Sequence, residues 1–188
     1  MEPVFQPWPK IARLYRDVVI TEKIDGTNAC VVIEDDGSIY AQSRTRIITP
    51  DSDNFGFARW VEDNRQALGA ALGAGRHYGE WWGRGIQRGY GLDERRFSLF
   101  NVRRHGWLND PAAQAGNELG LRTVPVIYEG PFSTDVVENA LDILRSLGSR
   151  AVPGFMKPEG IVVFHTASST MYKVTLEGDE APKGAQRG

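Results

Sequence analysis

The sequence has few of the features that mark several classes of protein. It contains a single cysteine, Cys30, which excludes an internal disulfide, and no group of cysteine and histidine has zinc-site spacing. No apolar run approaches the roughly 20 residues of a membrane span. The first residues lack the basic-then-apolar pattern of a signal peptide. We therefore expect an intracellular, cytoplasmic protein without a membrane segment.

Charge of either sign is not in excess. The chain has 22 basic and 24 acidic residues and a net charge of −2, so a surface for nucleic acid must be a local patch. Its 188 residues, of which 41% are hydrophobic, are enough for one domain with a buried core.

Periodic apolar residues divide the chain into strands and helices. They predict strands over residues 18–22, 27–34, 38–43, 76–83, 96–102, 123–128, 159–165 and 170–176. Helices are predicted over 55–72, 110–119 and 133–147, with a polar loop over 44–54. The pair Asp36-Gly37 favours a tight hairpin. This pattern indicates an α+β domain with largely antiparallel sheets, followed by a disordered tail over 178–188.

The heptad Glu22-Lys23-Ile24-Asp25-Gly26-Thr27-Asn28 is the most informative stretch. Lys23 follows one apolar run and precedes another, beside a glycine turn that a Cβ would obstruct. This position suits an amine presented into a pocket, where a lysine acts as a nucleophile once it is unprotonated. The alternative is a solvated lysine at the end of a strand.

Five sequence blocks occur in a fixed order: EKIDGTN (22–28), SRTR (43–46), YGEWWG (78–83), FSLFNV (97–102), and PEGIVVF (158–164) with MYKV (171–174). This series resembles the covalent nucleotidyltransferase superfamily of DNA ligases, RNA ligases and mRNA capping enzymes. Within it, the chain is most similar to the RNA ligase 2 family of phages and bacteria. The resemblance runs from about Val19 to Val174, and it implies the nucleotidyltransferase fold of a ligase adenylylation domain.

The resemblance also implies a domain organisation. It assigns residues 1–177 to the adenylylation domain. Larger ligases and capping enzymes add an OB-fold or a helical domain, and the 15 residues after Lys173 leave no room for either. Only 22 residues precede Lys23, too few for the extra domain of NAD-dependent ligases, so we expect ATP.

The resemblance implies roles for the charged residues of the blocks. Lys23 would attack the α-phosphorus of ATP and carry AMP, and Lys173 would clamp the α-phosphate. Glu159 would bind the catalytic Mg²⁺ or Mn²⁺, since carboxylate oxygens suit hard cations. Glu80 would contact the ribose or a metal-bound water. Each of these residues could instead be an ordinary surface or strand position.

The resemblance implies that four further residues bind the nucleotide. Phe100 would stack on the adenine, unless it is an ordinary core residue, and Phe97 is the alternative stacker. Arg44 would reach the ribose or the strand end, with Arg46 as its competitor. Asn28 would orient the lysine or a metal-bound water. Glu22 completes the predicted nucleotide-binding set.

The chain departs from the family pattern at two positions. Met171 stands where a lysine is common, so one phosphate contact is missing or is supplied from elsewhere, with Lys157 as a candidate. Asn101 stands where an acid is common. Met171 is the feature that favours a non-catalytic binding module that kept the fold.

Residues 84–104 hold six arginines against two acids. A local cluster of this kind suits a polynucleotide backbone. It predicts nucleic-acid contacts by Arg84, Arg88, Arg95 and Arg96. The alternative is a solvated loop.

These observations predict an ATP-dependent polynucleotide ligase that joins 3′-hydroxyl and 5′-phosphate ends, those of RNA above all. Its expected partners are nucleic acid and a protein that helps to grip the substrate. The alternatives are a minimal ATP-dependent DNA ligase, a capping guanylyltransferase, and a non-catalytic module that binds nucleotides or nucleic-acid ends.

Overall fold

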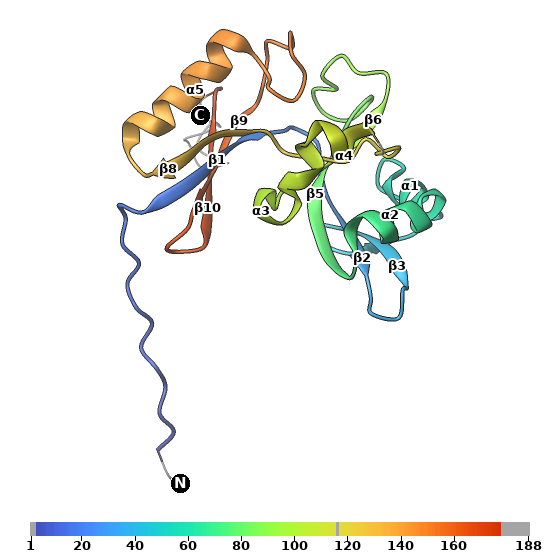
Figure 1. The fold of residues 1–188 in the computed structure, drawn as a ribbon, viewed down its shortest axis with the longest axis horizontal. Helices are drawn as coiled ribbons and strands as arrows, with labels where there is room; N and C mark the ends of the chain where they lie inside the picture. The colour runs from blue at the N-terminus through green and yellow to red at the C-terminus, as the bar shows by residue number, and fades with distance from the viewer. Residues whose placement is uncertain (1–2, 116, 178–188) are drawn as a thin grey trace, which may run out of the picture.

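Two β-sheets make up the fold, the first covered by one helix and the second by two (Figure 1). The computed structural model describes residues 3–115 and 117–177. Within that part of the chain, no helix is long and apolar enough to cross a membrane. The tail predicted over 178–188 lies outside the described residues.

The first sheet has the strand order β10-β9-β1-β8, with every neighbouring pair antiparallel. Its strands are β1 (Asp17–Lys23), β8 (Val126–Pro131), β9 (Gly160–His165) and β10 (Thr170–Thr175). Helix α5 (Thr134–Leu147) packs Leu141 and Leu144 on one face, against Ile20 and Ile161. The helix begins where the Ser133 hydroxyl accepts the Val136 N–H, as the sequence predicts.

The second sheet has the order β4-β3-β2-β5-β6-β7. Its strands are β2 (Thr27–Ile33), β3 (Ile39–Ser43), β4 (Ile47–Ile48), β5 (Gly75–Gly83), β6 (Arg95–Leu99) and β7 (Arg122–Thr123), and only the β6–β7 pair is parallel. Helices α1 (Phe57–Asp63) and α2 (Arg65–Leu72) cover its outer face. There the ring of Phe57 lies 5.3 Å from that of Trp81 and 5.1 Å from that of Phe97. These aromatic contacts anchor α1 to the sheet.

The predicted α+β class and the hairpin at Asp36-Gly37 are confirmed, but several boundaries differ. The predicted helix 55–72 is interrupted at Asn64, and the predicted loop 44–54 contains β4. The predicted strand 96–102 ends at Leu99, because the Asn101 side chain accepts the Arg104 N–H and starts α3 (Val102–His105). The 3-10 helix η1 (Gly106–Asn109) and a short α4 (Pro111–Ala115) follow.

The chain passes from one sheet to the other at two adjacent places. Between β1 and β2 it crosses through residues 24–26, and between β7 and β8 it crosses through Val124 and Pro125. The predicted strand 123–128 is therefore split between two sheets. The Glu22 N–H donates to the Pro125 carbonyl at 2.9 Å, which joins the two crossings. Ile24, Trp82, Tyr90 and Val124 form a small core at this seam between the sheets.

A buried histidine pair closes the far end of the second sheet. His77 on β5 and His105 on α3 are 1% and 3% exposed, with His77 Nδ1 3.3 Å from His105 Nε2. His77 Nε2 lies 2.9 Å from the Gly73 carbonyl and donates to it, so His77 Nδ1 accepts from His105. Burial lowers the pKa of both, that of His105 to about 4, and the charge of Arg104 acts in the same direction.

This pair makes the protein sensitive to acid. As the pH falls from about 6.5 to about 4, unfolded His105 gains a proton that the folded residue resists, so the free energy of unfolding decreases. The two pKa values correspond to about 3 kcal/mol for His105. Urea unfolding across this pH range checks the effect. His105→Gln should show a shallower pH slope, and an unchanged slope would contradict the assignment.

Candidate active site

The heptad identified in the sequence lies at the seam between the two sheets. Lys23 is the last residue of β1 and pairs with Gly160 of β9 in the first sheet. Asn28 is the second residue of β2 and pairs with Glu80 of β5 in the second sheet. The six residues from Lys23 to Asn28 therefore bring groups from both sheets together.

Lys23 and Glu159 form an ion pair. Lys23 Nζ donates to Glu159 Oε2 at 2.6 Å, and the two side chains are 25% and 17% exposed. The next residue, Gly160, has φ +156, and a Cβ there would collide with the carbonyl oxygen of Val174 on β10. The predicted nucleophile thus lies directly beside the predicted metal ligand, and both remain accessible to solvent.

The turn after Lys23 is held by hydrogen bonds from β5 and from the loop that follows it. The Asp25 N–H donates to Tyr90 Oη at 2.9 Å, and the Gly26 N–H donates to Glu80 Oε1 at 3.1 Å. Asn28 Nδ2 donates to the second oxygen of Glu80, also at 3.1 Å. A Cβ on Gly26 would lie 2.7 Å from Trp82 Cβ, so glycine permits the close approach of the turn to β5.

Glu80 has an unusual charge state. Burial raises its pKa from 4.5 to about 7, although the positive charge of Lys23 and the Gly26 N–H favour the ionised form. Both of its oxygens bind the 26–28 segment. In the protein alone Glu80 therefore fixes the turn, and its predicted contacts to a ribose or a metal stay predictions.

Glu22 lies behind the site. It is 1% exposed, and adjacent residues of a strand point to opposite faces, so its side chain is directed away from Lys23. Its carboxylate accepts from the Ser149 hydroxyl at 2.6 Å and from the N–H groups of Arg150 and Ala151 at 2.7 and 3.0 Å. Burial raises its pKa despite these bonds. Glu22 thus ties β1 to the loop after α5.

Strand register places Lys173 on the same face of the first sheet as Lys23. Lys173 pairs with Val162, which pairs with Thr21, so Lys173 shares the sheet face of Lys23 and lies two residue pairs away, on β10, with β9 between it and β1. Met171 is on the same face but two further pairs away, in the row of Val19. The predicted phosphate-binding lysine is therefore close to the predicted nucleophile.

The second sheet turns a polar and aromatic face toward the seam. Asn28, Glu80 and Ser98 form one paired row on this face. Phe100 donates its N–H to the Tyr78 carbonyl, which extends the pairing and places Tyr78 beside it. Phe100 is 37% exposed and Tyr78 is 52% exposed. Phe97, the alternative stacker, lies in the core on the opposite face.

Arg44 is exposed in a polar hollow of about 270 Å³ beside the start of β2. Its competitor Arg46 donates instead to Ser52, through the carbonyl at 2.9 Å and the hydroxyl at 3.0 Å. Both arginines are exposed and line this hollow, but of the two only Arg46 is engaged by Ser52, which favours Arg44 as the ligand-binding residue.

The four arginines that were predicted to contact nucleic acid do not form one continuous basic surface. Arg95 donates to the carbonyls of Phe55 and Arg84, and Arg96 pairs with Glu94 at 2.6 Å. Arg84 is exposed, whereas Arg88 turns toward the heptad and lies 3.1 Å from Asp25. Their predicted contacts to nucleic acid stay predictions.

Glu159 carries the carboxylate at the site that could bind the predicted cation. Among the described residues, no group of three or more His, Cys, Asp or Glu could hold a metal ion. Mg²⁺, however, commonly uses one or two carboxylates together with phosphate oxygens and water. Glu159, accessible beside Lys23, suits that arrangement.

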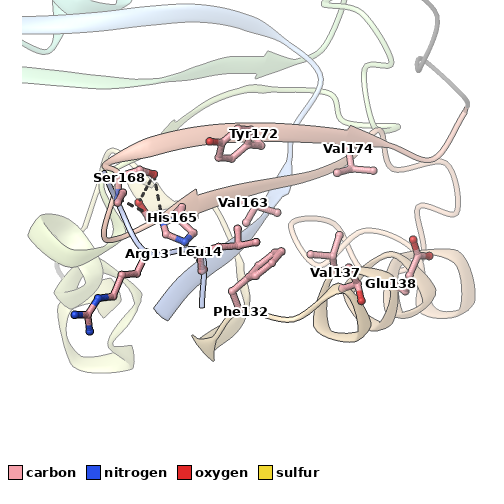
Figure 2. Close-up of a pocket in the computed structure, with 12 residues that line it drawn as sticks. Arg13, Leu14, Phe132, Val137, Glu138, Val163, His165, Ser168, Tyr172 and Val174 are labelled. Carbon is pink, nitrogen blue, oxygen red and sulfur yellow. Dashed lines mark hydrogen bonds between the residues drawn. The ribbon is translucent and has the colours of Figure 1, made fainter. Parts of the chain in front are cut away.

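A larger cavity, of about 570 Å³, lies on the other side of the first sheet (Figure 2). It is lined by Val163, Tyr172 and Val174 of the sheet and by Phe132 and Val137 near the start of α5. These strand residues face away from Lys23, because they share rows with Ile20 and Glu22. The chemistry of the heptad is therefore not located in this cavity.

A family model for RNA ligases matches residues 16–175. The chain belongs to the RNA ligase family. This confirms the resemblance that the five blocks indicate. A comparison with curated protein sequences finds no match.

Solved structures show the same fold as this member of the RNA ligase family. An RNA ligase of Naegleria gruberi, solved as a mutant with AMP and Mn, is 20% identical over 86% of this chain, with a TM-score of 0.57. An archaeal ATP-dependent RNA ligase is 21% identical over 91% of this chain, with a TM-score of 0.55. The match covers 50% and 48% of those two proteins, so the chain spans about half of their length.

Several residues that shape this RNA ligase site have no signal in the sequence. Ser149 lies far from the heptad in sequence but contacts Glu22, and Tyr90 lies in a glycine-rich loop but contacts Asp25. Tyr78 belongs to the YGEWWG block, and its strand position beside Phe100 could have indicated it. Ser149 and Tyr90 could not be indicated in this way, because their roles depend on contacts across the seam.

We expect Glu22→Gln to destabilise the protein by about 2 kcal/mol, because an amide cannot accept all the donors that the carboxylate accepts. Ser149→Ala, which removes one donor to Glu22 and the acceptor of the Ala151 and Val152 N–H groups, should also cost about 2 kcal/mol. Urea unfolding at pH 7 measures both. Equal stability of Glu22→Gln and the wild type would contradict the bracing role of Glu22.

Proposed function

We propose that this chain is an ATP-dependent RNA ligase that acts through AMP attached to Lys23. The observation that carries the proposal is the position of the Lys23 amine, accessible at the seam and 2.6 Å from Glu159, in a chain whose residues 16–175 match the RNA ligase family. We assign residues 1–177 to the nucleotidyltransferase domain.

Three transfers would make up the reaction. Lys23 Nζ, after losing a proton, forms a bond to the α-phosphorus of ATP while the bond to pyrophosphate breaks. The AMP then moves to the 5′-phosphate of an RNA end. The 3′-hydroxyl of the second end attacks that phosphate, and AMP leaves. Lys173 lies on the face of Lys23, where its charge stabilises negative charge on the α-phosphate.

Glu159 would hold the divalent cation together with phosphate oxygens of ATP. Bound Mg²⁺ or Mn²⁺ neutralises the charge of the phosphates. The Naegleria structures contain AMP or ATP with Mn, which supports the same ligands here. Before the cation binds, the Lys23–Glu159 pair fixes the position of the amine.

The second sheet would bind the nucleoside. Phe100 and Tyr78, both exposed beside each other on the seam face, offer aromatic surface to the adenine. Arg44 in its polar hollow offers donors to ribose oxygens or to the strand end. Asn28 and Glu80 position the turn that carries Lys23.

Lys23→Ala should abolish covalent labelling, because no other amine replaces the attacking Nζ. Incubation with α-labelled ATP and Mg²⁺, followed by denaturing electrophoresis and acid treatment, measures the label. Lys10→Ala, in the exposed segment before β1, is the matched control and should label like the wild type.

Labelling of Lys23→Ala at the wild-type level would refute the nucleophile. A wild-type protein that binds ATP, takes no label and releases no AMP on addition of pyrophosphate would instead be the non-catalytic module.

The proposed RNA substrate predicts a preference for a ribose at the 3′-hydroxyl end. Nicked duplexes that differ only in that sugar should be sealed at least about tenfold faster with RNA, because a site that hydrogen-bonds a hydroxyl disfavours its absence. Single-turnover sealing rates measure this preference. Equal rates would favour the DNA ligase alternative.

A further inference from the structure

Arg88 lies at the seam and has no role in the reaction proposed above. Its Nε lies 3.1 Å from Asp25 Oδ2, and one terminal nitrogen lies 3.4 Å from Glu177 Oε2. The Nε atom is shielded from solvent, yet its geometry toward Asp25 is not that of a hydrogen bond, and no other described residue accepts from it. The side chain remains 24% exposed, so a ligand can reach it.

The loop that carries Arg88 is packed against the core at the seam. Ile86 and Tyr90 are buried on either side of Arg88, and the Tyr90 ring lies 4.9 Å from Trp82 and 4.5 Å from Phe155. Gln87 and Tyr90 have positive φ values of 45° and 54°, a conformation that persists only where surrounding contacts impose it. Arg88 is therefore held in place before any ligand binds.

The two carboxylates hold Arg88 with unequal strength. Glu177 is 77% exposed and its contact is long, so this ion pair exchanges readily for a better partner. Asp25 is two residues beyond Lys23 and directs the guanidinium toward the heptad. Burial lowers the pKa of Arg88, but Glu177, Asp25 and Glu159 together raise it, so the group stays charged.

Cations lie on both sides of Lys23 along β1. Lys173 lies in the row of Thr21, before Lys23, whereas Arg88 contacts Asp25, after Lys23. If the α-phosphate lies at Lys23 beside Lys173, the remaining phosphates of ATP extend toward Arg88. A planar guanidinium donates two parallel hydrogen bonds to a phosphate, which suits this position.

We propose that Arg88 binds the β- and γ-phosphates of ATP during adenylylation of Lys23, exchanging Glu177 for the nucleotide. This proposal rests on the proposed function. In that step the Nζ–phosphorus bond forms, the bond from the α-phosphorus to the bridging oxygen breaks, and pyrophosphate leaves with the electron pair. Arg88 stabilises the charge that accumulates on the leaving group, and Met171 leaves this task to a residue outside β10.

Equilibrium binding separates the phosphates from the nucleoside. In a Lys23→Ala background with Mg²⁺, Arg88→Gln should weaken ATP binding about tenfold to a hundredfold, because a charge-assisted hydrogen bond to phosphate is lost. AMP binding should change less than about twofold, since AMP lacks the two outer phosphates. Arg88→Lys should be intermediate, and Arg65→Gln, in a surface pair on α2, should match its parent.

If Arg88→Gln weakened the binding of ATP and of AMP equally, the proposal would be overturned, and Arg88 would be assigned to the positioning of the turn. Unchanged ATP binding would overturn it as well. Glu177→Gln tests it without disturbing a buried group, because loss of the exposed competitor should strengthen ATP binding and leave AMP binding unchanged. If Glu177→Gln had no effect on ATP binding, this would contradict the proposed exchange of Glu177 for the nucleotide.

Sealing of pre-adenylylated RNA, in chains that keep Lys23, identifies the step. Arg88→Gln should seal it at the wild-type rate, because no triphosphate takes part, while labelling by ATP slows. An equal loss in sealing would assign Arg88 to RNA and overturn the proposal. If the wild type takes no label, the proposed function fails, but the ATP and AMP titrations still test Arg88.

Discussion

The arrangement of the site depends on the bracing of one turn between two sheets. The chain leaves the first sheet at Lys23 and enters the second at Thr27. Glu80 binds this turn with both oxygens, and Tyr90 accepts the Asp25 N–H. Because Gly26 approaches β5 without a Cβ, the turn lies close against the sheet. Without these contacts, the amine of Lys23 would have no fixed relation to the second sheet.

Charge at the seam is balanced before a nucleotide binds. Lys23 pairs with Glu159, and Arg88 lies between Asp25 and Glu177. A polyphosphate and its cation can replace such pairs without leaving a charge unpaired, which limits the cost of desolvation. Burial raises the pKa of Glu80 to about 7, so near neutral pH this carboxyl is only partly ionised. The pairs thus keep the cations ordered until a ligand replaces their partners.

Sequence patterns predicted most strands and the hairpin because alternation and turn residues are local. They missed the break at Asn64, the cap at Asn101 and the division of strand 123–128, since each depends on neighbours distant in sequence. The blocks also predicted Lys23, Glu159 and Lys173, which the register brings together. The positions of Glu22 and Arg88 could not be predicted, because their partners follow from the crossing.

The sequence by itself determined the family and the class of fold, because both depend on blocks whose order is preserved along the chain. It also determined that a lysine beside a glycine turn would follow the first strand. Only the tertiary structure decided which groups surround that lysine. Tyr90, Ser149 and Arg88 reach the heptad across the seam, from 63 to 127 residues away along the chain. Side-chain contacts at that separation depend on how two sheets pack, which no local pattern encodes.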